Sequence, residues 1–302
     1  MQCELKTMNG INAIDRMPAL RKAKSRRGRA IKVAILAAIP ALGLMSSLCG
    51  SADASVSVST PTNSSTITVD PTIGLTGWTV GGVSQLATQQ FFYRIGPSGG
   101  QTTLGSNAAP APTVNSGLGT IAVNYNNPTF TTGVLYPLSG SGSTASLNEQ
   151  VTINNVSGAS IDLYFFKYAD YNLNGQSANQ TATISGTPAN TVDQYDQNTI
   201  VKNETVGGGG GTSPDFIEAT TSSALLTSLQ SAVTPAALTT NAGAGPGDVN
   251  WAMEWHRTIA SGGSLILTIP TTIQPVPEPT IATMSLGACG LLTLRRRRRR
   301  AN

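Results

Sequence analysis

Along Val249–Ile259, apolar side chains alternate with small or polar ones, and this pattern constrains the fold of the chain more than any other feature. The odd positions are apolar apart from Arg257, and the even positions are small or polar. Because successive side chains of a β-strand point to opposite faces, this period predicts a strand with one buried and one solvated face. Ser261-Gly262-Gly263 follows, and apolar residues then recur on alternate positions from Leu265 to Ile269. We therefore predict a β-hairpin at the end of the folded body.

Residues 147–169 have a similar organisation. Val151 and Ile153 precede a turn at Asn155-Val156-Ser157-Gly158, and the segment Ile161–Tyr168 after the turn is apolar on both faces. A strand that is apolar on both faces is typical of the middle of a sheet, where other elements cover both sides. The pattern predicts a second hairpin, whose returning strand is central.

Short strand-like runs, such as Thr66–Val69 and Ile121–Tyr125, recur along the chain and are separated by clusters of turn residues. Only 11% of the residues are charged, and glycine, serine, threonine and asparagine are abundant, which disfavours long helices. We predict an all-β body at residues 55–274, an antiparallel β-sandwich resembling a jelly roll. Ser222–Val233 is the best candidate for a short helix.

The charge of this body differs from that of the whole chain. The chain has a net charge of +4, but its basic residues are concentrated near the two ends. Residues 55–278 contain four basic and twelve acidic residues, a net charge of −8. Such a body has no basic groove for phosphates, so we expect no nucleic-acid partner. Cys3, Cys49 and Cys289 all lie outside this stretch, which excludes disulfides and thiolate zinc sites from the body.

The first 54 residues have the organisation of a secretory signal peptide. Seven basic residues between Arg21 and Lys32 are followed by the apolar run Val33–Met45 and then by Ala52-Asp53-Ala54. A positive start, a short apolar centre and an A-x-A cleavage site, here Ala52 and Ala54, define such peptides. The apolar run has 13 residues, which is too short to cross a bilayer of about 30 Å. We predict export by the general secretory route.

Residues 275–302 contain three unlike parts in a fixed order. The first part is the segment Val276, Pro277, Glu278 and Pro279. It stays extended, because each proline restricts its own backbone conformation and that of the residue before it. Residues 280–294 carry no charge and predict a transmembrane helix about 22 Å long, a length that local bilayer thinning accommodates. Cationic side chains at the end of the chain would hold that end in the cytoplasm and leave the body outside. They are Arg295, Arg296, Arg297, Arg298, Arg299 and Arg300.

This tail resembles the PEP-CTERM sorting signal, which consists of a Pro-Glu-Pro motif, one transmembrane helix and a terminal arginine cluster. The resemblance covers residues 275–300. It implies processing near Pro277-Glu278-Pro279 by exosortase, a membrane-embedded cysteine protease, in a Gram-negative bacterium that makes exopolysaccharide. It also implies a transient stay in the inner membrane before the product is released or attached at the cell surface. An ordinary tail anchor is the alternative, which explains the helix and the arginines but not the prolines.

Asp170, Asn172 and Asn174 precede Gly175 in the pattern D-x-N-x-N-G. Oxygen ligands on alternate positions before a glycine match the first half of a calcium loop. Such loops end with a bidentate glutamate, and Thr181 stands at that position. An Asx-rich turn that ends the preceding strand explains the same residues. We favour the turn and predict no cofactor, with calcium as the alternative.

His256 is the only histidine, so any Ser-His-Asp triad or histidine zinc site would depend on it. It stands two residues from Glu254 on the polar face of the predicted strand, and the chain has no G-x-S-x-G elbow. The spacing of the carboxylates singles out no glycosidase-like pair. We therefore predict a structural histidine and no catalytic residue.

The three tryptophans allow two interpretations. Trp78, Trp251 and Trp255, together with the tyrosines, would suit either a sugar-stacking platform or the core of the body. Trp251 and Trp255 share the apolar face of their strand, and large aromatic residues on such a face are usually buried. We therefore predict that they pack in the core.

The sequence predicts an exported, non-enzymatic surface protein with a structural role in an exopolysaccharide-rich extracellular matrix. Its expected partners are the secretion machinery, exosortase, the membrane during sorting, and exopolysaccharide. The low charge and the abundance of serine, threonine and asparagine suit a sugar-rich environment and glycosylation. A carbohydrate-binding module or adhesin is the first alternative function, and a secreted hydrolase is the second.

Overall fold

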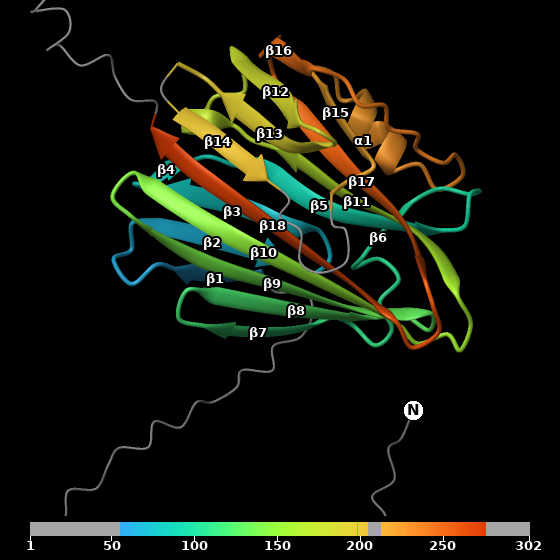
Figure 1. Ribbon diagram of the computed structural model, residues 1–302. Helices are drawn as coiled ribbons and strands as arrows, with labels where there is room; N and C mark the ends of the chain where they lie inside the picture. Colours follow the sequence, from blue (N-terminus) through green and yellow to red (C-terminus); the bar gives the residue numbers. More distant parts are fainter. Residues whose placement is uncertain (1–54, 198, 205–212, 276–302) are drawn as a thin grey trace, which may run out of the picture. The chain divides into compact units, whose positions relative to one another are not determined.

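The computed structural model describes residues 55–197, 199–204 and 213–275, which form two β-sheets of nine strands each (Figure 1). Sheet A contains β1 (Val56–Ser59), β2 (Ser65–Asp70), β3 (Gly74–Val80), β4 (Val83–Ser84), β5 (Thr88–Ile95), β6 (Thr102–Thr103), β11 (Ile161–Asp170), β15 (Phe216–Thr220) and β17 (Asn250–Ile259). Sheet B contains β7 (Thr113–Gly117), β8 (Thr120–Asn126), β9 (Phe130–Ser141), β10 (Thr144–Asn155), β12 (Gln180–Gly186), β13 (Ala189–Tyr195), β14 (Thr199–Glu204), β16 (Gly243–Gly247) and β18 (Ser264–Pro275).

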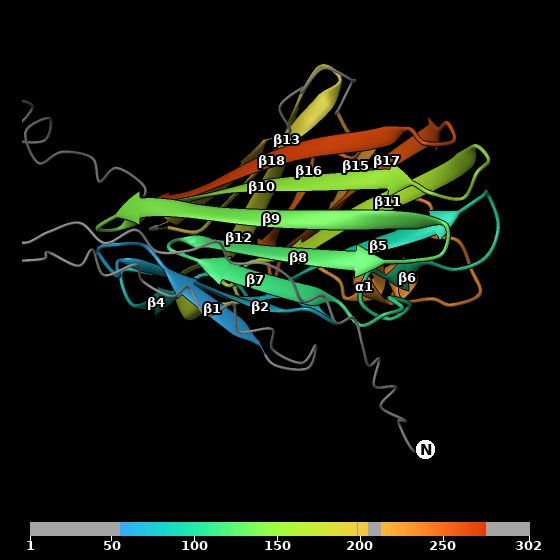
Figure 2. The ribbon, with the colours of Figure 1, turned by 90° about the horizontal axis from the view of Figure 1, so that it is seen from below.

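All the strand pairings in both sheets are antiparallel. The order in sheet A is β1-β2-β3-β5-β11-β17-β15, with β4 paired to β3 and β6 paired to β5. The order in sheet B is β16-β12-β13-β14-β18-β10-β9-β8-β7. Figure 2 shows β18, β10, β9, β8 and β7 side by side as one layer.

The two sheets share one apolar core, so the predicted antiparallel sandwich is confirmed. The apolar odd positions of β17 and alternate positions of β18, such as Leu267 and Ile269, are buried there, whereas Arg257 is half-buried. Trp78, Trp251 and Trp255 are also fully buried, which confirms their predicted place in the core and leaves no tryptophan platform at the surface. Each sheet alone has more strands than a whole eight-stranded jelly roll, so the jelly-roll part of the prediction is not confirmed.

The predicted terminal hairpin is wrong. β17 pairs with β11 and β15 in sheet A, whereas β18 pairs with β10 and β14 in sheet B. The turn at residues 260–263 therefore carries the chain from one sheet to the other. Alternation of side chains fixes which face of a strand is buried, but it does not fix the neighbouring strand. Two strands that face each other across a core have the same pattern as two strands that pair.

The second predicted hairpin is wrong for the same reason. β10 belongs to sheet B and β11 belongs to sheet A. The predicted central position of the returning strand is confirmed, because β11 lies between β5 and β17 and is buried along most of its length. Since β10 pairs with β18 and β11 pairs with β17, the two crossings lie together at one end of the sandwich, at the lower right of Figure 1.

Asn155 joins these two crossings. Its side-chain Nδ2 donates to the carbonyl oxygens of Ile259 (2.9 Å) and Ala260 (3.0 Å), which begin the other crossing. Its backbone N–H donates to the Gly263 oxygen (3.0 Å), and its own backbone oxygen accepts from Gly262 (3.2 Å). Asn155 is 1% exposed, and its bond to the Ile259 oxygen is buried, so the two crossings are joined partly within the core.

A second, smaller apolar cluster covers the outer face of sheet A. Helix α1 (Ala224–Leu229), which falls within the predicted helical segment, places Leu225 and Leu229 against Phe166 and Ala252 (Figure 1). The predicted solvated face of β17 is therefore wrong along part of the strand, because Asn250, Ala252 and Glu254 are buried. Only the even positions at the far end, His256 and Thr258, are exposed.

In the part of the chain that the structure describes, no helix is long and apolar enough to cross a membrane. The predicted signal peptide with Ala52 and Ala54, the Val276–Pro279 motif, the transmembrane segment 280–294 and the arginine cluster 295–300 lie outside the described residues.

Candidate functional site

The exposed end of β11 and β17 on sheet A carries a ladder of three stacked side chains. Tyr164 is paired in register with Arg94 of β5 on one side and with His256 of β17 on the other. The Tyr164 and His256 rings lie 3.9 Å apart with an interplanar angle of 13°. The Arg94 guanidinium lies 4.0 Å from the centre of the Tyr164 ring, in the geometry of a cation–π contact. The register of three neighbouring strands therefore brings these side chains together.

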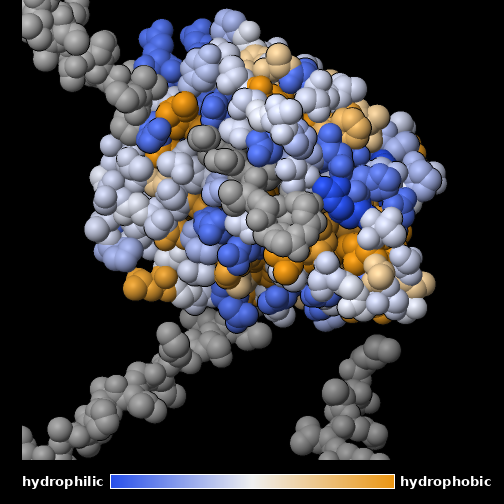
Figure 3. Space-filling model, in the orientation of Figure 1, coloured by the Kyte–Doolittle hydropathy of each residue, from blue (hydrophilic) through white to orange (hydrophobic). Residues whose placement is uncertain are grey.

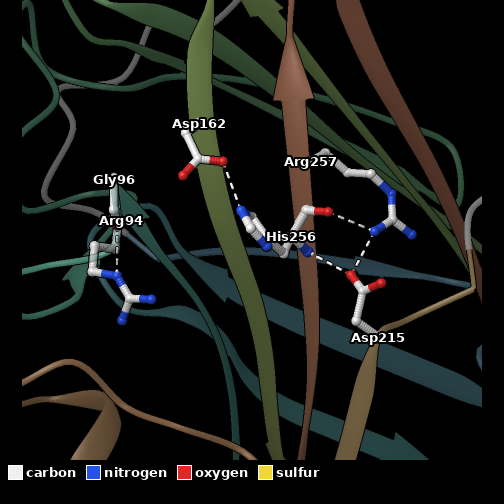
Figure 4. A network of polar contacts seen from close by, with 6 residues as sticks. All are labelled: Arg94, Gly96, Asp162, Asp215, His256 and Arg257. Atoms are coloured by element: carbon white, nitrogen blue, oxygen red, sulfur yellow. Dashed lines mark hydrogen bonds and ion pairs between the residues drawn. The ribbon is translucent and has the colours of Figure 1, made fainter.

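Charged groups lie beside His256, at one end of this ladder (Figure 4). His256 Nε2 lies 2.6 Å from Asp162 Oδ1, and the His256 backbone N–H donates to Asp215 Oδ2 at 2.7 Å. Arg257 also pairs with Asp215 and donates to the Ser213 oxygen at 2.7 Å. The side chains of His256 and Asp162 are 42% and 40% exposed, so both are accessible from solvent. The arrangement presents planar hydrogen-bonding groups that are held in place by their neighbours.

This geometry gives the histidine a carboxylate partner that sequence reasoning did not identify. Glu254, the expected neighbour, is 5% exposed, and burial raises the pKa of its carboxyl group. Asp162 comes instead from the adjacent strand, through the β11–β17 register, which no local pattern reveals. The contacts described for His256 include carboxylates and an aromatic ring but no serine hydroxyl. They therefore do not assemble the Ser-His-Asp arrangement that a triad hydrolase needs.

Three hollows of the described surface lack a carboxylate pair of the glycosidase kind. One lies between α1 and β15 and contains Glu218, and a second contains Asp196. A third, between residues 57–63 and 116–119, contains no acidic residue. Each of these three hollows offers one carboxylate at most, whereas glycoside hydrolysis needs two across the scissile bond.

In the predicted calcium loop, the side chain of Asn174 is engaged by β14 and the residues before it. Asn174, in left-handed backbone conformation (φ 56°), donates through Nδ2 to Asp196 at 2.9 Å and accepts through Oδ1 from Thr199 at 3.1 Å. Its amide is thus used to tie the turn Leu173–Gly175 to β14. Across the described residues, no three or more histidine, cysteine, aspartate and glutamate side chains come together as a metal site.

Asp170, the first residue of the predicted calcium loop, is the last residue of β11. It is opposite Asn250 in register, and it has a like charge nearby at Asp248. Burial, and then repulsion from Asp248, raises the pKa of Asp170 to about 6. The side-chain oxygens Oδ1 of Asp170, Asn172 and Asn250 are buried without a hydrogen-bond partner. The turn predicted from the sequence is present. Burial and the nearby Asp248 disfavour the charged form of the Asp170 carboxyl group that precedes it.

The core contains a polar cluster that sequence reasoning missed. Glu149 of β10 forms an ion pair with Lys167 of β11 and accepts a hydrogen bond from Gln89 of β5. All three are at most 1% exposed. Burial lowers the pKa of Lys167, and the neighbouring Glu149 carboxylate only partly offsets this effect. The available signal was a lysine at an inward-facing position of an otherwise apolar strand, between Phe165 and Ala169.

Comparison with known proteins identifies the architecture. No protein-family model matches the chain, and no curated protein sequence does. A bacterial glucoamylase, solved in complex with acarbose, superposes on 81% of this chain with a TM-score of 0.51 and 8% identity. The match spans about a third (35%) of the glucoamylase chain. A putative aldose 1-epimerase from Escherichia coli K12 matches 74% of this chain and 100% of its own, at a TM-score of 0.47 and 8% identity. The glucoamylase likeness shows a shared β-sandwich fold.

Proposed function

We propose that this chain is an exported, non-enzymatic protein of the extracellular matrix that associates with exopolysaccharide at the cell surface. The observation that carries the proposal is the ladder of Arg94, Tyr164 and His256, in which Arg94 is buried and His256 forms the exposed end, with the accessible carboxylates of Asp162 and Asp215 beside it. Planar carboxylate, imidazole and guanidinium groups form paired hydrogen bonds with sugar hydroxyls, and a rigid sheet holds them in fixed positions.

The rest of the surface supports the same role. The body is acidic and sparsely charged, and weakly polar residues, in pale colours, predominate on the face shown in Figure 3. Exposed large apolar residues such as Leu118 and Val233 are scattered along the chain. A hydrated polysaccharide that contacts such a surface would form hydrogen bonds with the hydroxyl and amide groups of the protein. The glucoamylase with the shared fold was solved with a sugar-like ligand, which agrees with this choice of partner.

Delivery to the surface rests on the two ends of the chain. The signal-peptide pattern at residues 1–54 and the PEP-CTERM-like tail at 275–302 predict export, then processing by exosortase near Pro277-Glu278-Pro279. The intact mass of the protein from the native host's surface and culture medium tests this. We expect a mature form from near Ser55 to near the Pro-Glu-Pro motif, with added mass if it is glycosylated. Retention of the apolar segment and the arginines would instead identify a permanent tail anchor.

Binding to polysaccharide is tested separately. We expect the mature protein to co-sediment with exopolysaccharide purified from the native host. The double variant Asp162→Ala/His256→Ala should bind about tenfold more weakly, since it loses two hydrogen-bonding side chains. Gln150→Ala changes an exposed polar residue of sheet B and serves as the matched control.

The outcomes separate the candidate functions. Equal binding by the unmutated protein, the double variant and Gln150→Ala would show that this surface does not bind the polysaccharide. No binding by any of the three would show that exopolysaccharide is not the partner. Tight, saturable binding of one defined oligosaccharide would favour the alternative, a carbohydrate-binding module.

A further inference from the structure

A carboxylate, an amine and a carboxamide meet in the apolar core between the two sheets. Glu149 comes from β10 of sheet B, and Gln89 and Lys167 come from the adjacent strands β5 and β11 of sheet A. Their exposures are 0%, 1% and 0%, and the Trp251 ring lies 5.7 Å from the lysine nitrogen. The cluster is buried among apolar residues, and residues 55–278 contain no cysteine that could cross-link the body.

Glu149 bridges the other two groups. One carboxylate oxygen accepts from Lys167 Nζ, and the other accepts from Gln89 Nε2. Gln89 is opposite Ala169, and Lys167 is opposite Phe91, so Gln89 and Lys167 are diagonal neighbours on the inward face of sheet A. Diagonal neighbours are about 7–8 Å apart, within reach of two long side chains. The amine and the carboxamide are thus held against the same carboxylate.

Stabilisation by the ion pair does not explain this cluster well. Two buried ions each lose several kcal/mol of hydration, and apolar side chains in their place commonly give equal or greater stability. Gln89 Oε1 and the Tyr136 phenol group are also buried without a hydrogen-bond partner, so the cluster leaves polar groups unsatisfied. Transfer of one proton from Lys167 to Glu149 removes both charges and leaves a neutral amine, which is a nucleophile, and a neutral acid.

We propose that Lys167 and Gln89 become joined by an intramolecular amide bond, with Glu149 as the acid–base group. Lys167 Nζ, after giving a proton to Glu149, attacks Cδ of Gln89 and forms a tetrahedral intermediate. Glu149 then returns that proton to Nε2 of Gln89, the Cδ–Nε2 bond breaks, and ammonia leaves. Glu149 takes the second proton from the attacking nitrogen, so the new amide is neutral and Glu149 ends as the neutral acid. Two N–H bonds of Lys167 and one C–N bond of Gln89 are broken, and one C–N bond, one N–H bond of ammonia and one O–H bond of Glu149 are formed. No oxidant, reductant or other reactant is required.

The bond would connect the middle strands of sheet A covalently. It closes the chain between residues 89 and 167 into a loop, which restricts the unfolded state as a disulfide does. Such a link resists reduction and suits a cysteine-free body outside the cell.

Mass spectrometry of the denatured full-length or mature protein tests the proposal directly. The protein should be lighter than its sequence by one ammonia molecule. Trypsin should fail to cut after Lys167, and the peptide that ends at Arg94 should remain attached to the peptide of residues 95–202. The full sequence mass with free cutting after Lys167 overturns the proposal. Loss of one water with a link to Glu149 overturns the assignment of Gln89.

Variants identify the acid–base group. Glu149→Gln keeps the size of the side chain, and it should restore the full mass and the cut after Lys167. Gln90→Asn changes the neighbouring glutamine, which lies on the opposite face of β5, and it should keep the loss of ammonia. Circular dichroism reports whether each variant folds. The mass of the unmutated protein decides the question even if Glu149→Gln does not fold.

Discussion

Asn155 is the residue on which the connection between the two sheets depends most. It is buried, and its side-chain amide donates to two carbonyl oxygens of the neighbouring crossing, Ile259 and Ala260. Its side-chain oxygen accepts from the Ser157 backbone at 3.0 Å, so one side chain satisfies backbone groups of both crossings. A residue without that amide would lose the buried bond to the Ile259 oxygen and the part-buried bond to the Ala260 oxygen, which weakens the link between the crossings.

We expect Asn155→Ala to lower the free energy of unfolding by about 2–3 kcal/mol, because one buried and several part-buried hydrogen bonds of a buried side chain are lost together. Urea unfolding followed by tryptophan fluorescence measures the change. Asn154→Ala is the matched control, since Asn154 is partly exposed and bonds the side chains of Thr131 and Ser264. A similar loss in both variants would contradict the role given to Asn155.

Asp170 should make stability depend on pH. Its pKa is about 6 in the folded protein and near 3.8 in the unfolded chain, because burial and Asp248 disfavour the charged form. Between these values the folded state binds more protons, so this group lowers stability as pH rises and gives its full penalty above about 6.

The variant Asp170→Asn removes this dependence. We expect it to be more stable than the unmutated protein at pH 7 by about 1–2 kcal/mol, after allowance for solvent screening, and equally stable near pH 4. Thermal unfolding across that range measures it. Asp248→Asn should give a smaller gain, since repulsion is the lesser cause. Parallel pH curves for the Asp170 variant and the unmutated protein would rule the explanation out.

At the scale of elements, close backbone contacts fix how loops cover sheet A. The Gln101 N–H donates to the Ser231 oxygen at 3.1 Å, which brings the segment after β5 against the segment after α1. A β-carbon on Gly100 would lie 1.9 Å from that same oxygen. Only glycine permits this approach, which helps to keep the outer apolar cluster covered.

Gly100→Ala should therefore destabilise the protein by about 2 kcal/mol, because the two segments must separate. Differential scanning calorimetry would show a lower melting temperature. Gly117→Ala is the control, since a β-carbon there meets no atom within 4 Å, and its effect should stay within about 0.5 kcal/mol. A similar melting temperature for both variants would mean that the contact at Gly100 is dispensable.

Elements were predictable from the sequence where the information is local. The period of Val249–Ile259 identified a strand and its core face, because that face is set by successive side chains. Its partners were not predictable, since β11 and β15 come from distant parts of the chain. The Asp162–His256 contact and the Glu149–Lys167 pair depend on the same distant placement. Local patterns therefore gave the fold class and missed the site.

For the whole molecule, one core that includes strands of both sheets predicts uneven protection from hydrogen exchange. The backbone amides of β10, β11 and β17 have paired strands on both sides and should exchange slowest. β7 and β16 lie at the edges of sheet B, and most residues of β7 are exposed, so both should exchange fastest. Exchange followed by mass spectrometry checks this order. Fast exchange in β11 would contradict the central position of that strand.

The position of β18 has a mechanical consequence. This last strand is interior to sheet B, between β14 and β10, and it ends at Pro275, where the predicted sorting tail begins. Ladder hydrogen bonds run perpendicular to the strands, so tension along β18 loads the bonds of both ladders in parallel. An edge strand would be peeled away one bond at a time. A body tethered by its C-terminal end therefore bears that pull in shear, through the middle of a sheet.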